Sequence, residues 1–139
     1  MKSAIFAAFG AVGAFIAAAL GGWDTAIITM AAFMGIDLVT GWIVAFVFKK
    51  SHKTETGGYS SAIGWKGLCK KVTVFLLVVM ANLLDKQTGA NYFRDSVCIA
   101  FSFNEAVSIL ENAGLMGIPI PAPLKKALDV LNTGQEGKA

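Results

Sequence analysis

Charge is scarce in this sequence. Only 15% of the residues are charged while 55% are hydrophobic, and the mean hydropathy is +0.63. Between Ser3 and Phe48 the charged residues are Asp24 and Asp37 alone. Soluble domains carry about 25% charged residues. The composition therefore excludes an ordinary globular domain and predicts one small integral membrane domain over residues 1–139.

Cysteine and histidine are nearly absent as well. The two cysteines, Cys69 and Cys98, have no C-x-x-C spacing and no nearby histidine, which argues against a metal site. The single His52 lies among lysines and is better explained as a solvated loop residue than as a ligand or a base. The sequence also lacks a nucleophile paired with a base and a glycine-rich phosphate loop. We therefore expect no catalytic residue, no metal and no cofactor.

Two long apolar stretches open the chain. Residues 4–22 carry no charge, and a helix of that length, at about 1.5 Å per residue, just crosses a hydrocarbon core of about 30 Å. Residues 25–48 form a second stretch of similar reach. The short turn between them predicts an antiparallel transmembrane hairpin. A cleaved signal peptide is the alternative, and the second apolar stretch argues against it.

Two shorter helices are expected at residues 68–84 and 95–113. The apolar block from Val72 to Leu84 has 13 residues, short of the roughly 20 that a membrane-spanning helix needs, so it crosses only if its neighbours extend it. The other helix pairs an apolar stripe with a narrow polar one. In the tail, residues 114–139, three prolines from Pro119 to Pro123 impose an extended segment before a short closing helix.

The basic residues predict the orientation. The loop at residues 49–71 holds six lysines against Glu55 alone, and basic loops tend to stay cytoplasmic. Four crossings would place both termini in the cytoplasm of a bacterium; if the third or fourth block lies flat, three or two crossings result. Because apolar helices flank it, this loop indicates topology and anionic-lipid contact, with no nucleic-acid partner.

Residues 59–71 mix aromatic, apolar and basic side chains, which is typical of a segment lying on the inner leaflet. A solvated linker is the alternative. The candidate residues for the lipid interface are Lys49, Lys50, Trp65, Lys66, Lys70 and Lys71.

Asp37 is the residue that most needs an explanation. An aspartate near the middle of a membrane helix costs about 2.5–3.5 kcal/mol, and the apolar residues of its own helix offset roughly 3–7 kcal/mol. Thr40 and Gly41 share its helix face and form a small polar notch. Asp37 is therefore either a structural contact between helices or a group that faces water or controls assembly.

Further polar and small residues bear on the same choice. In the fourth helix Asn104, Glu105 and Ser108 form a stripe that needs water or protein if the helix is in the membrane and is merely solvated if it is not. With Asp37 and Thr40 they are candidate pore-lining or gating residues.

Rows of small residues permit close helix packing, within one chain or between copies. The candidates for such packing are Gly10, Gly13, Ala14, Ala17 and Gly41.

Several motifs together resemble one family. They are Asp37-x-x-Thr40-Gly41, the stretch Ser60-Ser61-x-x-Gly64-x-Lys66-Gly67, the run from Phe103 to Asn112, and Gly117-Ile118-Pro119-Ile120-Pro121. From about Asp37 to Leu131 the chain resembles the toxin-secretion and phage-lysis holins, and the run from Asn104 to Pro121 is the most specific part. The first helix matches in character only.

The resemblance implies a non-enzymatic pore-former. Such a protein accumulates in the bacterial cytoplasmic membrane and, at a critical density, assembles with its own copies into lesions that release a murein hydrolase or a toxin. The assignment of Asp37, Asn104 and Glu105 as lining or gating groups does not come from the resemblance and is a hypothesis from the residues. Two alternatives stay open: a small ion-coupled transporter or channel subunit that uses Asp37 and Glu105, and an antiholin or assembly protein.

Overall fold

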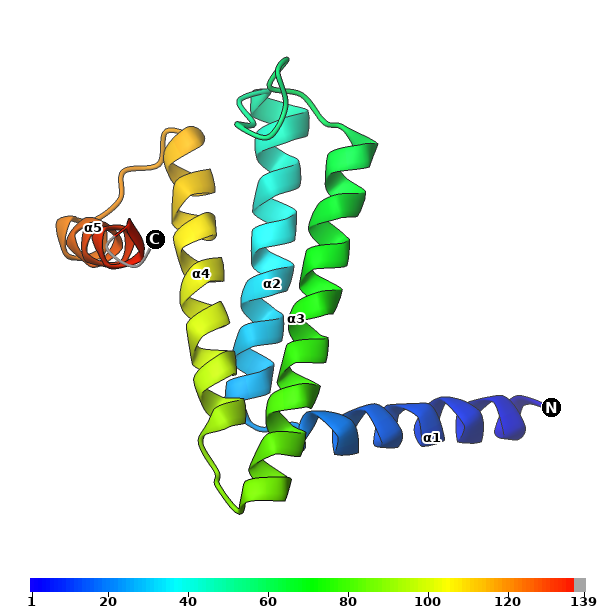
Figure 1. The fold of residues 1–139 in the computed structure, drawn as a ribbon. Coiled ribbons are helices and arrows are strands. Elements are labelled where there is room, and N and C mark those ends of the chain that lie inside the picture. Colours follow the sequence, from blue (N-terminus) through cyan, green and yellow to red (C-terminus); the bar gives the residue numbers. More distant parts are fainter. Residues whose placement is uncertain (137–139) are drawn as a thin grey trace.

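The structure, a computed structural model, describes residues 1–136, without the side chains of residues 128, 131, 132 and 134–136. Every element within that part is helical, as Figure 1 shows. The elements are α1 (Lys2–Leu20), α2 (Thr25–Ile43), η1 (Val44–Phe48), α3 (Ser61–Thr88), α4 (Phe93–Leu115) and α5 (Ala122–Glu136). The all-α membrane fold is confirmed. Residues 137–139 of the predicted tail lie outside the described residues.

Three rods form the body of the molecule. The π-helical η1 continues α2, and this rod, α3 and α4 stand side by side, with α3 antiparallel to the other two (Figure 1). In lipid such helices associate through packing and polar contacts rather than through exclusion of water. The core of the bundle is made of Ile27, Met30 and Met34 from α2, Val74 and Val78 from α3, Cys98 from α4, and Leu20.

The outer surface of the bundle suits a bilayer. By length and composition α1, the α2–η1 rod and α3 can each cross a membrane. Large apolar side chains such as Leu76, Leu83 and Phe103 are exposed on its outside. The helix α4 carries more charge and is not among these candidate spans, yet it packs along both α2 and α3.

The prediction of an antiparallel hairpin was wrong about the direction of α1. This helix leaves one end of the bundle crosswise and contacts α3 near its own C-terminal end (Figure 1). Residues 1–16 are all exposed. The apolar length of α1 fits a membrane span, but its direction depends on the turn at Gly21 and Gly22, whose φ angles are 83° and 104°. Contacts with residues more than sixty positions away hold that turn, and no local pattern reveals them.

The predicted short third helix, 68–84, is in fact the 28-residue α3. Its first turns include most of the segment that was expected to lie on the membrane surface, so the basic loop shrinks to residues 49–60. The helix extends beyond its apolar block at both ends, where Lys71 and Asp85 bind partners on the other rods. The other helix boundaries lie within a few residues of their predicted positions, and α5 begins directly after the second proline.

Candidate functional site

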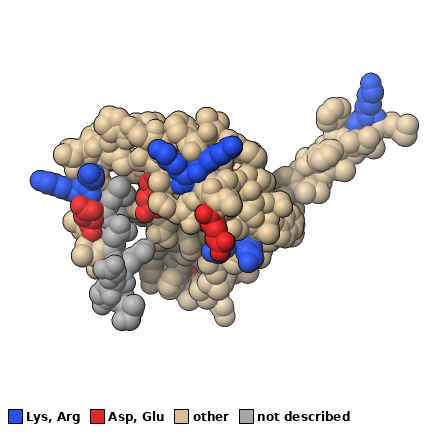
Figure 2. Space-filling view, turned by 90° about the horizontal axis from the view of Figure 1, so that it is seen from above, with Lys and Arg blue, Asp and Glu red and all other residues tan. Residues whose placement is uncertain are grey.

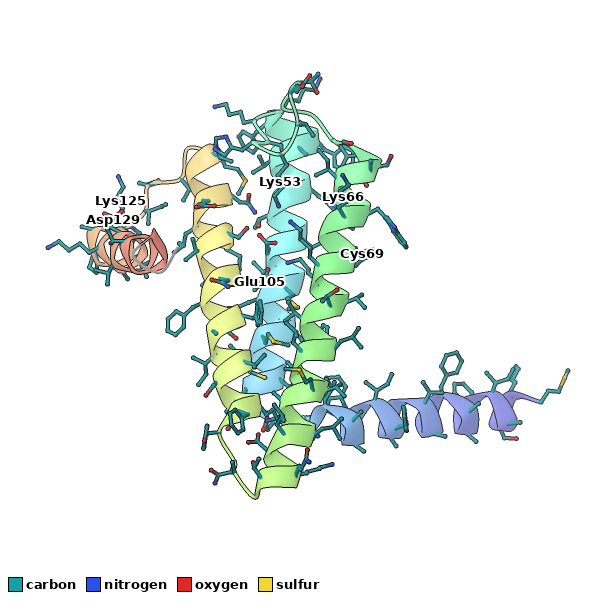
Figure 3. All side chains as sticks on the ribbon, viewed as in Figure 1. Lys53, Lys66, Cys69, Glu105, Lys125 and Asp129 are labelled. Atoms are coloured by element: carbon teal, nitrogen blue, oxygen red, sulfur yellow. The ribbon has the colours of Figure 1, made fainter. Side chains whose placement is uncertain are left out.

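Three charged side chains meet inside the bundle, one from each rod. The Nζ of Lys71 on α3 donates to Oδ2 of Asp37 on α2 at 2.9 Å and to Oε2 of Glu105 on α4 at 2.5 Å. All three side chains are shielded, with exposed fractions of 15%, 8% and 13% in that order. Figure 3 shows Glu105 on the α4 rod beside the other two rods. We call these three residues the ion cluster; it has one positive and two negative charges.

Neutral groups complete the environment of Asp37. The amide of Asn112 donates to Oδ1 of Asp37 at 3.3 Å and to Oγ1 of Thr40 at 3.0 Å. The Thr40 hydroxyl donates to the backbone oxygen of Asp37 at 3.1 Å, and Ser108 lies near the Asp37 side chain. Both carboxylate oxygens of Asp37 are therefore satisfied, which is what a charge at membrane depth requires.

Helical spacing explains why these residues meet. On α4, Glu105, Ser108 and Asn112 recur at intervals of three and four and so lie on one face. On α3, Lys71 has the same spacing to Val74 and Val78, which belong to the core. The Lys71 side chain therefore points into the bundle. Its prediction as a lipid-interface residue was wrong.

A cavity of about 110 Å³ lies between the ion cluster and the loop at residues 49–60. Asp37, Lys71 and Asn112 contribute to its wall from the helices, and His52 and Lys53 contribute from the loop. A water molecule needs about 10–15 Å³ of such space and two or more polar partners. The cavity can therefore hold several waters, which would hydrate the cluster from the loop end of the bundle.

The structure brings together most of the predicted pore-lining residues, though not all of them. Asp37, Thr40, Glu105 and Ser108 lie at the ion cluster. Asn104 is exposed on the outside of α4. Their role as lining or gating groups stays a prediction.

The other predicted residues are distributed over the surface. Gly10 and Gly13 have no heavy atom within 4 Å of a Cβ built on them, Ala14 is exposed and Ala17 is half-buried. A Cβ on Gly41 would lie 3.8 Å from the Asn112 amide nitrogen, so this glycine does face α4. The remaining lipid-interface candidates are exposed: Lys49, Lys50, Trp65, Lys66 and Lys70.

Sequence reasoning missed Lys71 and Asn112 as members of the site, and it missed the buried Arg94 elsewhere in the bundle. For Lys71 the available signal was its register with Val74 and Val78. For Arg94 there was none, because it was read as part of a polar connection of zero net charge. Arg94 is only 6% exposed and bonds to the turn between α1 and α2, at the end of the bundle away from the ion cluster.

Comparison with known proteins assigns this architecture to a family. The bacteriophage holin family matches residues 14–133. The chain belongs to the bacteriophage holin family. Members of this family are pore-formers and not enzymes, and they act as membrane oligomers together with lysis machinery. This holin-family chain is accordingly a membrane protein.

Several curated proteins resemble this holin-family chain along most of their length. A probable holin of Bacillus phage phi105 is 32% identical over 104 residues, which cover 74% of this chain and 71% of that protein. An uncharacterized 14.9 kDa protein in the nagH 3′ region of Clostridium perfringens is 36% identical, covering 81% and 80%. An uncharacterized protein of Halalkalibacterium halodurans is 34% identical, covering 85% of each. No solved structure is significantly similar to the chain.

Proposed function

We propose that this chain gathers in the bacterial cytoplasmic membrane, assembles with its own copies and opens lesions through which a murein hydrolase escapes, so that the cell lyses. The observation that carries the proposal is the ion cluster inside the bundle of a holin-family chain. Charged groups within a membrane domain are costly and mark functional sites. A relative encoded by a Bacillus phage is named a probable holin, which supports lysis rather than toxin export as the task.

The ion cluster suits a protein whose polar groups change their environment as its density in the membrane rises. In a single copy Lys71 neutralises one carboxylate charge and the three rods shield the group from lipid. When copies assemble, the same rods can separate and turn these polar groups toward water, which replaces the lost ion pairs. Because water hydrates charge well and lipid does not, such a rearrangement stabilises an aqueous path. Asp37, Thr40, Glu105 and Ser108 would then line it.

We expect the copies to contact one another through α1. This helix is uncharged from Ser3 to Leu20, and its Phe6, Phe9 and Phe15 side chains are each more than 70% exposed. Apart from Leu20 it lies outside the core of its own bundle, so lipid or another copy covers it in a membrane. The small residues at Gly10, Gly13 and Ala14 would allow another helix to approach closely.

The topology we propose follows from the basic side chains. Lys49, Lys50 and Lys53 lie at one end of the bundle, where Figure 2 shows several basic side chains. This end faces the cytoplasm by the positive-inside rule. The three rods then cross the membrane, the turn at Gly89 lies outside, and the C-terminus is cytoplasmic. The N-terminus is cytoplasmic only when α1 turns antiparallel to α2 and makes a fourth crossing.

Expression together with a cytoplasmic endolysin tests the proposal. After induction in bacteria we expect growth to continue until the protein reaches a threshold, then an abrupt loss of membrane potential and escape of the endolysin within minutes. A culture expressing the chain without endolysin should lose potential and viability but not turbidity. Continued growth with intact potential, despite confirmed membrane insertion, would contradict an autonomous pore-former and favour an antiholin.

One observation favours a second candidate, a small ion-coupled transporter or channel subunit. The ion cluster has an excess negative charge and adjoins a cavity that polar residues line in part. Such a site could take up a proton or a monovalent cation. A transporter keeps the membrane closed to proteins, so loss of potential without endolysin escape would favour this candidate.

A further inference from the structure

The end of the bundle away from the ion cluster holds a second set of polar contacts around one arginine. Arg94 donates to the backbone oxygens of Leu20 at 2.5 Å and Gly22 at 3.1 Å. Its guanidinium also binds both carboxylate oxygens of Asp24, at 2.6 and 3.0 Å, and Oδ1 of Asp95 at 2.9 Å. Together these contacts form the Arg94 clasp. It joins the first turn of α4 to the C-terminal end of α1 and to the start of α2.

The clasp is anchored firmly on the bundle. Asp85 on α3 accepts from the backbone N–H groups of Tyr92, Phe93 and Arg94, at distances between 2.9 and 3.2 Å. This carboxylate caps the exposed donors at the N-terminus of α4 and fixes the backbone of Arg94. On the other side Asp24 caps α2 by accepting from the N–H of Ile27 at 3.2 Å. The hydrogen bond from Arg94 holds the pKa of Asp24 below its usual value, so this carboxylate is charged at neutral pH.

The two glycines of the turn that the clasp holds can hardly be replaced by other residues. Gly21 and Gly22 both have left-handed φ angles, which residues with a Cβ rarely adopt. A Cβ on Gly21 would lie 2.6 Å from the side-chain oxygen of Asn82 and 2.8 Å from Nε of Arg94. Asn82 in turn donates to the backbone oxygen of Ala19 at 3.0 Å. The carbonyl groups at the end of α1 need partners. Those of Ala19 and Leu20 find them on α3 and α4, while those of Ala17 and Ala18 accept from the backbone N–H groups of Gly22 and Gly21.

Apart from these contacts and the buried Leu20 at its C-terminal end, little in the described part of the chain holds α1 in its direction. Its residues 1–16 are exposed, and Figure 1 shows the helix projecting away from the bundle. At 19 residues it is about 28 Å long, close to the thickness of a hydrocarbon core. The same helix could lie across the end of the bundle or stand antiparallel to α2 as a membrane span.

We propose that the Arg94 clasp is a latch that holds α1 across the end of the bundle, and that opening it lets α1 turn about Gly21 and Gly22 into another orientation. The latch concerns the shape of a single copy and goes beyond the proposed lysis function. Removing the guanidinium removes the contacts to both carbonyl groups and to Asp24 in one step. Adding a methyl group at Gly21 displaces the same contacts without changing any charge.

Distances between spin labels in lipid vesicles test the latch on the full chain. One label is placed at position 5 of α1 and one at position 76 of α3, both exposed, after Cys69→Ser removes the exposed cysteine. The unaltered clasp should give one distance population. Arg94→Gln and Gly21→Ala should each give a second population, shifted on the order of 20 Å by the swing of a 19-residue helix.

A matched control and a bundle reference make the result decisive. Lys86→Gln removes an exposed positive charge at the same end of the bundle and should leave the single population unchanged. A second label pair, at positions 76 and 103 on α3 and α4, should report the same distance in every variant. An unchanged α1 distance in both Arg94→Gln and Gly21→Ala would overturn the latch. A change in the bundle pair would overturn it as well, because Arg94 would then hold the whole bundle rather than α1.

Discussion

Lys71→Gln is expected to lower the free energy of unfolding by about 3–5 kcal/mol, the cost of leaving buried charges without their partner. In the bundle Lys71 is the cation that separates Asp37 from Glu105. Without it two carboxylates face each other within a membrane domain, where like charges repel strongly and water is scarce. The bundle then has to take up protons or open. Unfolding in mixed micelles, followed by circular dichroism as the fraction of denaturing detergent rises, measures the difference.

The adjacent lysine provides a close control. Lys70 is exposed, belongs to the same helix and has the same chemistry. Lys70→Gln should change stability by no more than about 0.5 kcal/mol, as is usual for surface substitutions. Equal effects of the two substitutions would mean that the ion cluster adds nothing specific to the fold.

Neutralising both acids should cost far more than the two single changes suggest. Asp37→Asn leaves Lys71 paired with Glu105, and Glu105→Gln leaves it paired with Asp37. Each single variant therefore retains one ion pair and loses the excess negative charge. The double variant leaves the ammonium group without a carboxylate. We expect its destabilisation to exceed the sum of the single effects by roughly 0.5–3 kcal/mol, the range found for residues in one network.

The same variants connect stability to function. If the ion cluster sets the threshold for assembly, the double variant should lyse cells earlier than the unaltered chain at equal protein level in the membrane. The single variants should shift the lysis time by less. Strictly additive stability effects together with unchanged lysis times would mean that Asp37 and Glu105 are only structural contacts between helices.

The sequence predicted the parts of the site that depend on local pattern. Apolar length placed Asp37 within a long apolar helix, and helical spacing grouped Glu105 with Ser108. Lys71 was missed because a lysine near the end of an apolar block normally marks the membrane interface. Its inward direction depends on acids contributed by two other helices, which no window along the chain contains. The length of α3 was not predicted for the same reason.

The direction of α1 could not be predicted from the sequence. Two apolar helices joined by a short turn usually form a hairpin, and nothing within residues 1–48 contradicts that arrangement. The deviation comes from Arg94, whose contacts with the turn span 72 and 74 positions. Glycines at the turn were visible, but the partners that fix their conformation were not.

Release of molecules of two sizes from lipid vesicles tests whether the chain assembles into lesions wide enough for an endolysin. The purified chain is reconstituted at increasing protein-to-lipid ratios into vesicles that contain a small dye and a dextran of endolysin size. A chain that assembles into lesions should retain both probes at low density and release both together above a threshold ratio. Release of the dye alone, or a proton flux with both probes retained at every ratio, would contradict the account and identify a channel or a transporter instead.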